Sequence, residues 1–222
     1  MPTLVDLLAH VSFLAAKPAV IGILITAGIL VVNRDWRLDA IALTVQYFFV
    51  VLLLTRLIRL EVAAVKGLIG WLICMVFYLT ERRASMFFEQ TSAASKENVS
   101  SRWHRWIVST QVSFHLLAGI LIAVAAYTAA LRIPLPEIPG DITLACYLLA
   151  GLGLLLIGLS EEPIQIGLGL LTFLSGFELF YVALEPSLAV TGLLGAVNFI
   201  IALATAYLRT TQIAVAEQGD TP

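Results

Sequence analysis

The chain has 222 residues, of which 60% are hydrophobic and 13% are charged, and its formal net charge at pH 7 is −2. A soluble domain usually has about a quarter of its residues charged, and one of this size has too small an interior to bury so much apolar surface, so the composition excludes a soluble fold. The small net charge gives no reason to expect nucleic acid as a partner.

The apolar residues form continuous blocks, each about as long as the roughly 20 helical residues that cross a hydrocarbon core of about 30 Å. A closed β-barrel would instead show short strands of alternating polarity. We therefore predict an all-α membrane protein with about seven transmembrane helices. In chain order, the predicted helices cover residues 15–32, 39–55, 62–80, 107–131, 142–159, 164–184 and 187–208.

Polar stretches flank or separate these helices and divide the chain into five parts. Residues 1–80 combine an N-terminal amphipathic segment with the first three helices, and residues 81–106 are a predicted cytoplasmic polar loop. Residues 107–141 hold the fourth helix and a proline-rich connection. Residues 142–208 hold the last three helices, and residues 209–222 are a polar tail.

The ends of the predicted helices carry further signals. The segment before the first helix fits either an interfacial amphipathic helix or an extension of that helix, and it does not resemble a removable signal peptide. Asp39, Asp141 and Ser187 stand at predicted helix starts, where their side chains can cap exposed amides. Glu161 and Glu162 also stand at a helix start, where negative charge suits the helix dipole, so they need no catalytic role.

Lys and Arg gather on the side of the membrane that carries the 81–106 segment. Cytoplasmic flanks carry such an excess, so we predict a plasma (bacterial inner) membrane protein with its N-terminus outside and its C-terminus in the cytoplasm. Trp36, Trp103 and Trp106 fall on the same boundary, where interfacial aromatic residues are expected. The basic residues between 82 and 105 are expected to lie near anionic lipids.

An internal repeat relates the first and last three helices. Residues 64–70 read AVKGLIG and residues 189–195 read AVTGLLG, and each heptad stands near the start of the third helix of its triplet. The fourth helix returns the chain across the membrane, so both triplets cross in the same direction. We interpret this as a parallel duplication of a three-helix unit. The alternative is that Gly and Ala recur because membrane helices pack closely through small residues.

Five polar residues within the predicted helices are candidates for a proton path, namely Lys66, His115 and Glu178, with the uncharged Gln46 and Asn198. Ionisable residues inside a membrane are costly, and for that reason they are functional candidates. Lys66 can instead extend to the headgroups, and His115 can be a neutral, hydrogen-bonded interior residue. Glu178 is the hardest to explain structurally, because it interrupts an apolar helix and needs protonation, a partner or water.

Enzyme motifs are missing from the sequence. It contains no glycine-rich phosphate loop, paired CxxC, HExxH or nucleophile elbow. Cys74 and Cys146 both fall in apolar segments and are interpreted as packing residues. We therefore expect no catalytic residues, no metal and no cofactor.

The last triplet carries a family resemblance. Residues 158–180, GLSEEPIQIGLGLLTFLSGFELF, and residues 191–210, TGLLGAVNFIIALATAYLRT, resemble the three-helix K chain of respiratory complex I and its counterpart, the C component of Mrp-type sodium/proton antiporters. The length and the doubled triplet are most similar to the E component of hydrogenase-4, a longer member of this group. The likeness covers about residues 152–209, and its motifs are mostly apolar.

The resemblance implies a proton path that uses one glutamate in each of the second and third helices of the triplet. Aligned with this chain, those positions fall on Gly169 and Asn198, so both glutamates are absent. Glu178 together with Asn198 offers a displaced version of that path.

The sequence thus leads to three functional hypotheses. The first is a non-catalytic membrane subunit of an ion- or proton-translocating complex, packed against larger antiporter-like subunits and contributing to or bordering a proton path. The second is a purely structural or assembly subunit. The third is a self-contained transporter of an ion or small solute.

Overall fold

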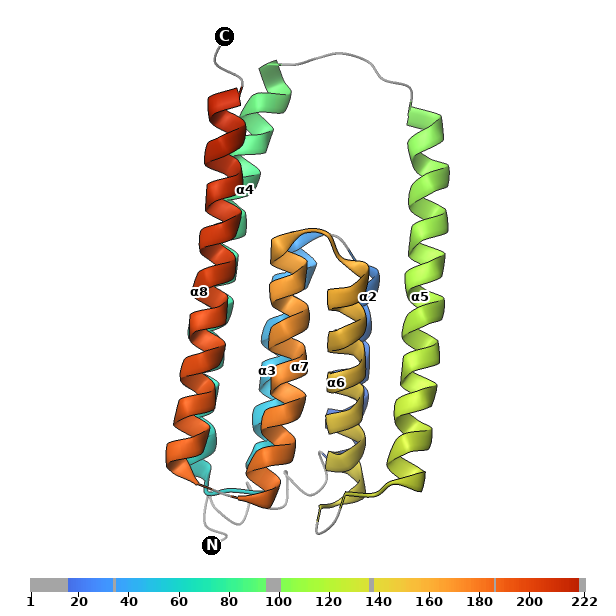
Figure 1. Ribbon diagram of the computed structural model, residues 1–222, viewed down its shortest axis with the longest axis vertical. Coiled ribbons are helices and arrows are strands. Elements are labelled where there is room, and N and C mark those ends of the chain that lie inside the picture. The colour runs from blue at the N-terminus through green and yellow to red at the C-terminus, as the bar shows by residue number, and fades with distance from the viewer. Residues whose placement is uncertain (1–15, 34, 95–100, 136–137, 186, 220–222) are drawn as a thin grey trace, which may run out of the picture.

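The computed structural model describes residues 16–33, 35–94, 101–135, 138–185 and 187–219, and all regular structure in these ranges is helical (Figure 1). The helices are, in chain order, α2 (Ala16–Val32), α3 (Trp36–Leu54), α4 (Leu60–Ala94), α5 (Ser101–Arg132), α6 (Gly140–Leu159), α7 (Pro163–Leu184) and α8 (Leu188–Gly219). The predicted all-α fold is confirmed for this part of the chain. The predicted amphipathic segment before α2 lies outside the described residues.

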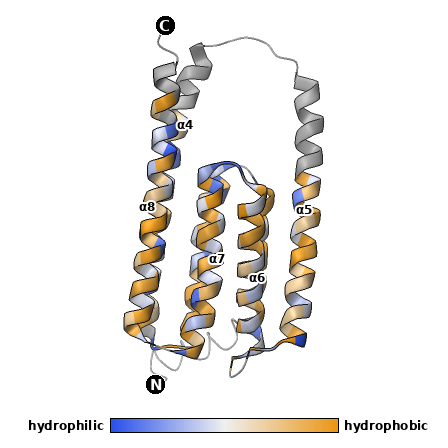
Figure 2. Cartoon of the chain, viewed as in Figure 1, coloured by the Kyte–Doolittle hydropathy of each residue, from blue (hydrophilic) through white to orange (hydrophobic). Residues whose placement is uncertain are grey.

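Six of these helices, α3 to α8, are long and apolar enough to cross a membrane. Helix α2 is also apolar but has only 17 residues. It stands beside the others in the bundle, at about the same height as α3, α6 and α7 (Figure 1). Hydrophobic residues dominate the height that these helices share, whereas hydrophilic residues gather at the connections (Figure 2). The chain is a multi-pass helical membrane protein.

Three helices continue well past the apolar blocks, all at the end of the bundle that carries the C-terminus (Figure 1). Helix α4 runs to Ala94 and α5 begins at Ser101, so the prediction of a loop at 81–106 is wrong apart from residues 95–100, which are not described. The predicted tail at 209–222 is helical as far as Gly219. Polarity marks where a chain leaves the hydrocarbon, not where its helix ends, and residues 81–94 contain no helix-breaking Gly or Pro.

Two of the predicted helix caps are wrong. Helix α3 begins at Trp36 with Asp35 as its N-cap residue, so Asp39 lies within the first turn. Helix α6 begins at Gly140, and Asp141 is bound to an arginine. Both helices start a little earlier than the hydropathy indicates, because polar residues near the membrane surface are already helical. The carboxylates are therefore free for contacts with other helices.

The two triplets pack against each other, and corresponding helices are paired. Helix α2 contacts α6, α3 contacts α7, and α4 contacts α8, while α5 packs only on α6 and α2 among the extensive contacts of the described residues. In Figure 1, α4 and α8 stand together on one side of the bundle and α5 stands on the other. This pairing is the arrangement that a parallel duplication produces, although the shared origin of the triplets remains a prediction.

Candidate functional site

Side chains from three helices meet in the interior of the bundle. Lys66 of α4, Glu178 of α7 and Asn198 of α8 are each at most 1% exposed. The Lys66 ammonium Nζ donates a hydrogen bond to Glu178 Oε2 and forms an ion pair with it. Asn198 Nδ2 donates to the same oxygen over 3.3 Å. The structure thus brings together three of the five sequence candidates into one cluster, which we call the central polar cluster.

The position of Lys66 decides between the two interpretations of that residue. A lysine that extended to the headgroups would leave its ammonium group exposed, whereas Lys66 is completely buried. Its Nζ also lies 5.5 Å from the centroid of the Tyr47 ring, within the range of a cation–π contact. Tyr47 was not predicted from the sequence, because an aromatic residue in an apolar helix carries no signal of its own.

Gln46, the fourth candidate, lies in the interface between α3 and α7. It is 1% exposed, and its Nε2 donates to Thr172 Oγ1 over 3.2 Å. Thr172, Ser175 and Glu178 follow one another at intervals of three residues on α7, so their side chains form a stripe that winds slowly around the helix. Thr172 and Ser175 were missed in the sequence analysis. The three-residue spacing that links them to Glu178 was the signal available.

His115 is not part of the cluster. It is partly buried on α5, where its ring makes an edge contact with Phe114 at a centroid distance of 6.2 Å. Helix α5 packs on α6 and α2, whereas the cluster is built from α4, α7 and α8. The grouping of His115 with the other candidates is therefore not supported, since it lies on a peripheral helix.

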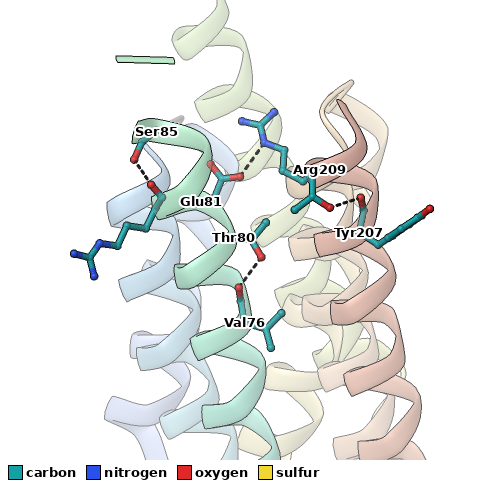
Figure 3. A network of polar contacts seen from close by, with 8 residues as sticks. Val76, Thr80, Glu81, Ser85, Tyr207 and Arg209 are labelled. Atoms are coloured by element: carbon teal, nitrogen blue, oxygen red, sulfur yellow. Dashed lines mark hydrogen bonds and ion pairs between the residues drawn. The ribbon is translucent and has the colours of Figure 1, made fainter. Parts of the chain in front are cut away.

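Among the described residues, three ion pairs join the first triplet to the second. Besides Lys66 and Glu178, Arg56 Nη1 contacts Asp141 Oδ2 at 2.6 Å, and Arg209 Nε contacts Glu81 Oε1 at 3.0 Å. Figure 3 shows Glu81 and Arg209 reaching toward each other from α4 and α8. One partly exposed pair thus lies near each end of the bundle, with the buried pair between them. Neither of these two outer pairs was predicted from the sequence.

The chemistry of the buried pair follows from its surroundings. The shared proton can lie on the lysine, which gives an ammonium and a carboxylate, or on the glutamate, which gives a neutral amine and a carboxylic acid. The total charge of the pair is zero in both forms. Either form keeps the hydrogen bond, but the loss of one partner leaves the other group buried and unpaired, which is strongly unfavourable. Glu178 Oε1 has no hydrogen-bond partner among the described residues. The arrangement can therefore hold a proton and exchange it with water that reaches this oxygen.

Nothing in the described residues groups three His, Cys, Asp or Glu side chains closely enough to hold a metal ion. Cys74 and Cys146 are both buried and unpaired with each other. Gly169, the position of the first family glutamate, packs against α6, because a Cβ there would lie 2.9 Å from Ile157 Cγ1. A glutamate at Gly169 would thus contact α6 and not the central polar cluster.

Comparisons with known proteins give no relative. No protein-family model, no curated protein and no solved structure matches the chain.

Proposed function

We propose that this chain is a non-catalytic membrane subunit of a proton-translocating complex, and that the central polar cluster is part of its proton path. The observation that carries the proposal is the ion pair between Lys66 and Glu178, which is completely buried where helices of both triplets meet. A charged pair inside a membrane protein costs several kcal/mol to desolvate, and apolar residues of similar size would often stabilise the fold better. A role in proton transfer explains why this chain has a buried ion pair at a place where apolar residues would be more stable.

The resemblance to the three-helix components of complex I and the Mrp antiporters supports the same function. Asn198 stands at one of the two family glutamate positions, and it donates a hydrogen bond to Glu178, which belongs to the neighbouring helix. One glutamate with an amide partner therefore occupies the region of the third-helix position, whereas the other position, Gly169, faces α6. We propose larger antiporter-like membrane subunits as partners. We also propose that anionic lipids lie beside Arg37 and Arg82, at the projecting end of the bundle, where α4, α5 and α8 extend beyond the other helices.

We expect Glu178→Gln to abolish most of the coupled proton movement of the native complex while leaving its assembly intact. Glutamine keeps the hydrogen-bonding shape next to Lys66 and Asn198 but holds no transferable proton. The measurement is proton uptake by sealed membrane vesicles that contain the complex. The matched control is Glu185→Gln, because Glu185 directly follows α7, seven residues after Glu178, and is exposed. Full coupling in Glu178→Gln rules out the proton role.

A structural role is the second candidate, because all three ion pairs in the described part of the chain connect the two triplets. On this alternative, a complex that lacks the chain falls apart, yet one that carries Glu178→Gln remains fully coupled. Gentle purification of the native protein, followed by identification of the copurifying subunits, supplies the complex for both tests. Proton or solute uptake by liposomes that contain only this chain would instead support the self-contained transporter.

A further inference from the structure

A cavity with a mixed polar and apolar lining opens between the helices, at the end of the bundle where α4, α5 and α8 extend beyond the other helices. Its volume is about 190 Å³, and Asp39, Glu81, Glu162, Gln165 and Arg209 supply its polar lining. These residues come from α3, α4, α7, α8 and the connection before α7, so the cavity lies where both triplets meet. It is large enough for several water molecules. Glu162 is exposed and stands at its rim.

Asp39 is the unusual member of this lining. The residue is 5% exposed, and its Oδ1 has no hydrogen-bond partner among the described residues. Glu81, by contrast, accepts a hydrogen bond from Arg209 Nε over 3.0 Å (Figure 3). Buried carboxylate oxygens without a protein partner are normally satisfied by water or by a proton. Asp39 therefore marks the cavity as a site for water and protons.

Buried polar groups continue from this cavity toward the central polar cluster. Gln46 follows Asp39 by two helical turns on the same face of α3, about 10 Å further along the axis. It is hydrogen-bonded to Thr172 of α7, and its Oε1 is a second buried oxygen without a partner in the described part of the chain. From Thr172 the stripe on α7 leads through Ser175, which is 1% exposed, to Glu178.

Toward the other end of the bundle the buried side chains are mostly apolar, and the buried polar residues near that end in the described part of the chain are Thr143 and Thr191, on α6 and α8. Glu178 lies six residues before the end of α7, and Lys66 lies six residues after the start of α4, so only about 9 Å of helix separates the pair from that end. The buried residues there include Val50, Leu53, Leu54, Leu179 and Val182, each at most 1% exposed. None of these five side chains offers a polar group that would continue the stripe.

We propose that water and protons reach Glu178 from the cavity at Asp39, along the interface of α3 and α7, and that the apolar residues beyond Glu178 close the opposite side. A proton taken up by the Asp39 carboxylate passes through water, beside Gln46, Thr172 and Ser175, to the Glu178 carboxylate, and Asp39 is ionised again. This inference rests on the proposed function, because a proton route is of use only if the chain takes part in proton movement. It adds the side of the membrane from which protons enter, which the distribution of Lys and Arg predicts to be the cytoplasmic side.

Water access is tested with single cysteines in the full chain, after Cys74 and Cys146 are replaced by alanine. Cysteines replace Thr172 and Ser175 of the stripe and Gln165 of the cavity lining, which are tested together as the stripe cysteines. In separate variants cysteines replace Ile166 and Phe177, whose side chains are exposed on the same helix. The probe is a cationic, membrane-impermeant methanethiosulfonate added to one face of sealed vesicles. Thr172→Cys and Ser175→Cys are nearly isosteric, so these two variants are expected to fold.

We expect the stripe cysteines to react at least about tenfold faster than those at 166 and 177, because a charged reagent is excluded from dry protein and lipid. The reaction should occur only from the face that labels Arg83→Cys, and not from the face that labels Glu185→Cys. Val182→Cys should stay unreactive from both faces. Stripe cysteines that react as slowly as the lipid-facing ones, or from the opposite face, overturn the proposal.

Proton entry at Asp39 has a separate test. Asp39→Asn should slow coupled proton movement severalfold without changing the labelling of the stripe, whereas Asp35→Asn, an exposed carboxylate four residues earlier, should have no effect. Unchanged coupling in Asp39→Asn contradicts the entry site. If the stripe is labelled but Glu178→Gln retains full coupling, the water path stands and the proposed function fails. If Glu178→Gln loses coupling and the stripe is unlabelled, the function stands and this inference fails.

Discussion

Lys66→Met is expected to destabilise the folded protein by about 3–5 kcal/mol, the usual cost of removing one partner of a buried ion pair. The substitution leaves the Glu178 carboxylate in the interior with the Asn198 amide as its only hydrogen-bond donor among the described residues. Glu178→Leu should have a similar cost, because it leaves the Lys66 ammonium buried against Tyr47. The measurement is reversible unfolding in mixed micelles of dodecyl maltoside and dodecyl sulfate.

The double variant Lys66→Met/Glu178→Leu distinguishes an ion pair from two independent polar groups. With both charges replaced by apolar side chains, stability should return to within about 1–2 kcal/mol of the original protein, with the remainder due to the unpaired Asn198 amide. Glu185→Leu, at an exposed position directly after the same helix, should change stability little. Additive losses in the double variant would show that the two residues do not stabilise each other.

The sequence predicted the fold well because hydrocarbon thickness imposes a length and a polarity on every span. Six long apolar helices and the short α2 fall where the hydropathy placed them. The extensions of α4 and α8 were not predicted, because a polar helix outside the membrane and a polar loop have similar compositions. The same ambiguity misplaced Asp39. Helix α3 begins three residues earlier than predicted. Asp39 is therefore not a cap but a buried carboxylate that lines the cavity.

The sequence predicted one proton path from five polar residues, but it did not predict which of them are in contact. Lys66, Glu178 and Asn198 each interrupt an apolar segment, and this marks them individually as candidates. Their contact depends on how α4, α7 and α8 are rotated about their axes, and no local pattern determines those rotations. The alternative that Lys66 extends to the headgroups was equally compatible with its position six residues into α4. The exclusion of His115 likewise follows only from the peripheral place of α5.

Gly153→Val should destabilise the protein by about 3 kcal/mol or more, because it overpacks the interface that fixes α7. A Cβ on Gly153 of α6 would lie 2.5 Å from the backbone nitrogen of Phe173 and 2.8 Å from the carbonyl oxygen of Gly169, both on α7. Backbone atoms have no other rotamer, so the two helices must separate.

The separation should disturb the central polar cluster as well as the interface. Glu178 lies nine residues after Gly169, which places it on the opposite face of α7, so an outward shift of the helix from α6 presses Glu178 toward α4 and α8. Gly158→Val is the matched control, because a Cβ at Gly158 of α6 meets nothing within 4 Å. The measurement is unfolding in mixed micelles together with proton uptake by vesicles. Equal stability of the two valine variants would mean that α6 and α7 do not approach as closely as described.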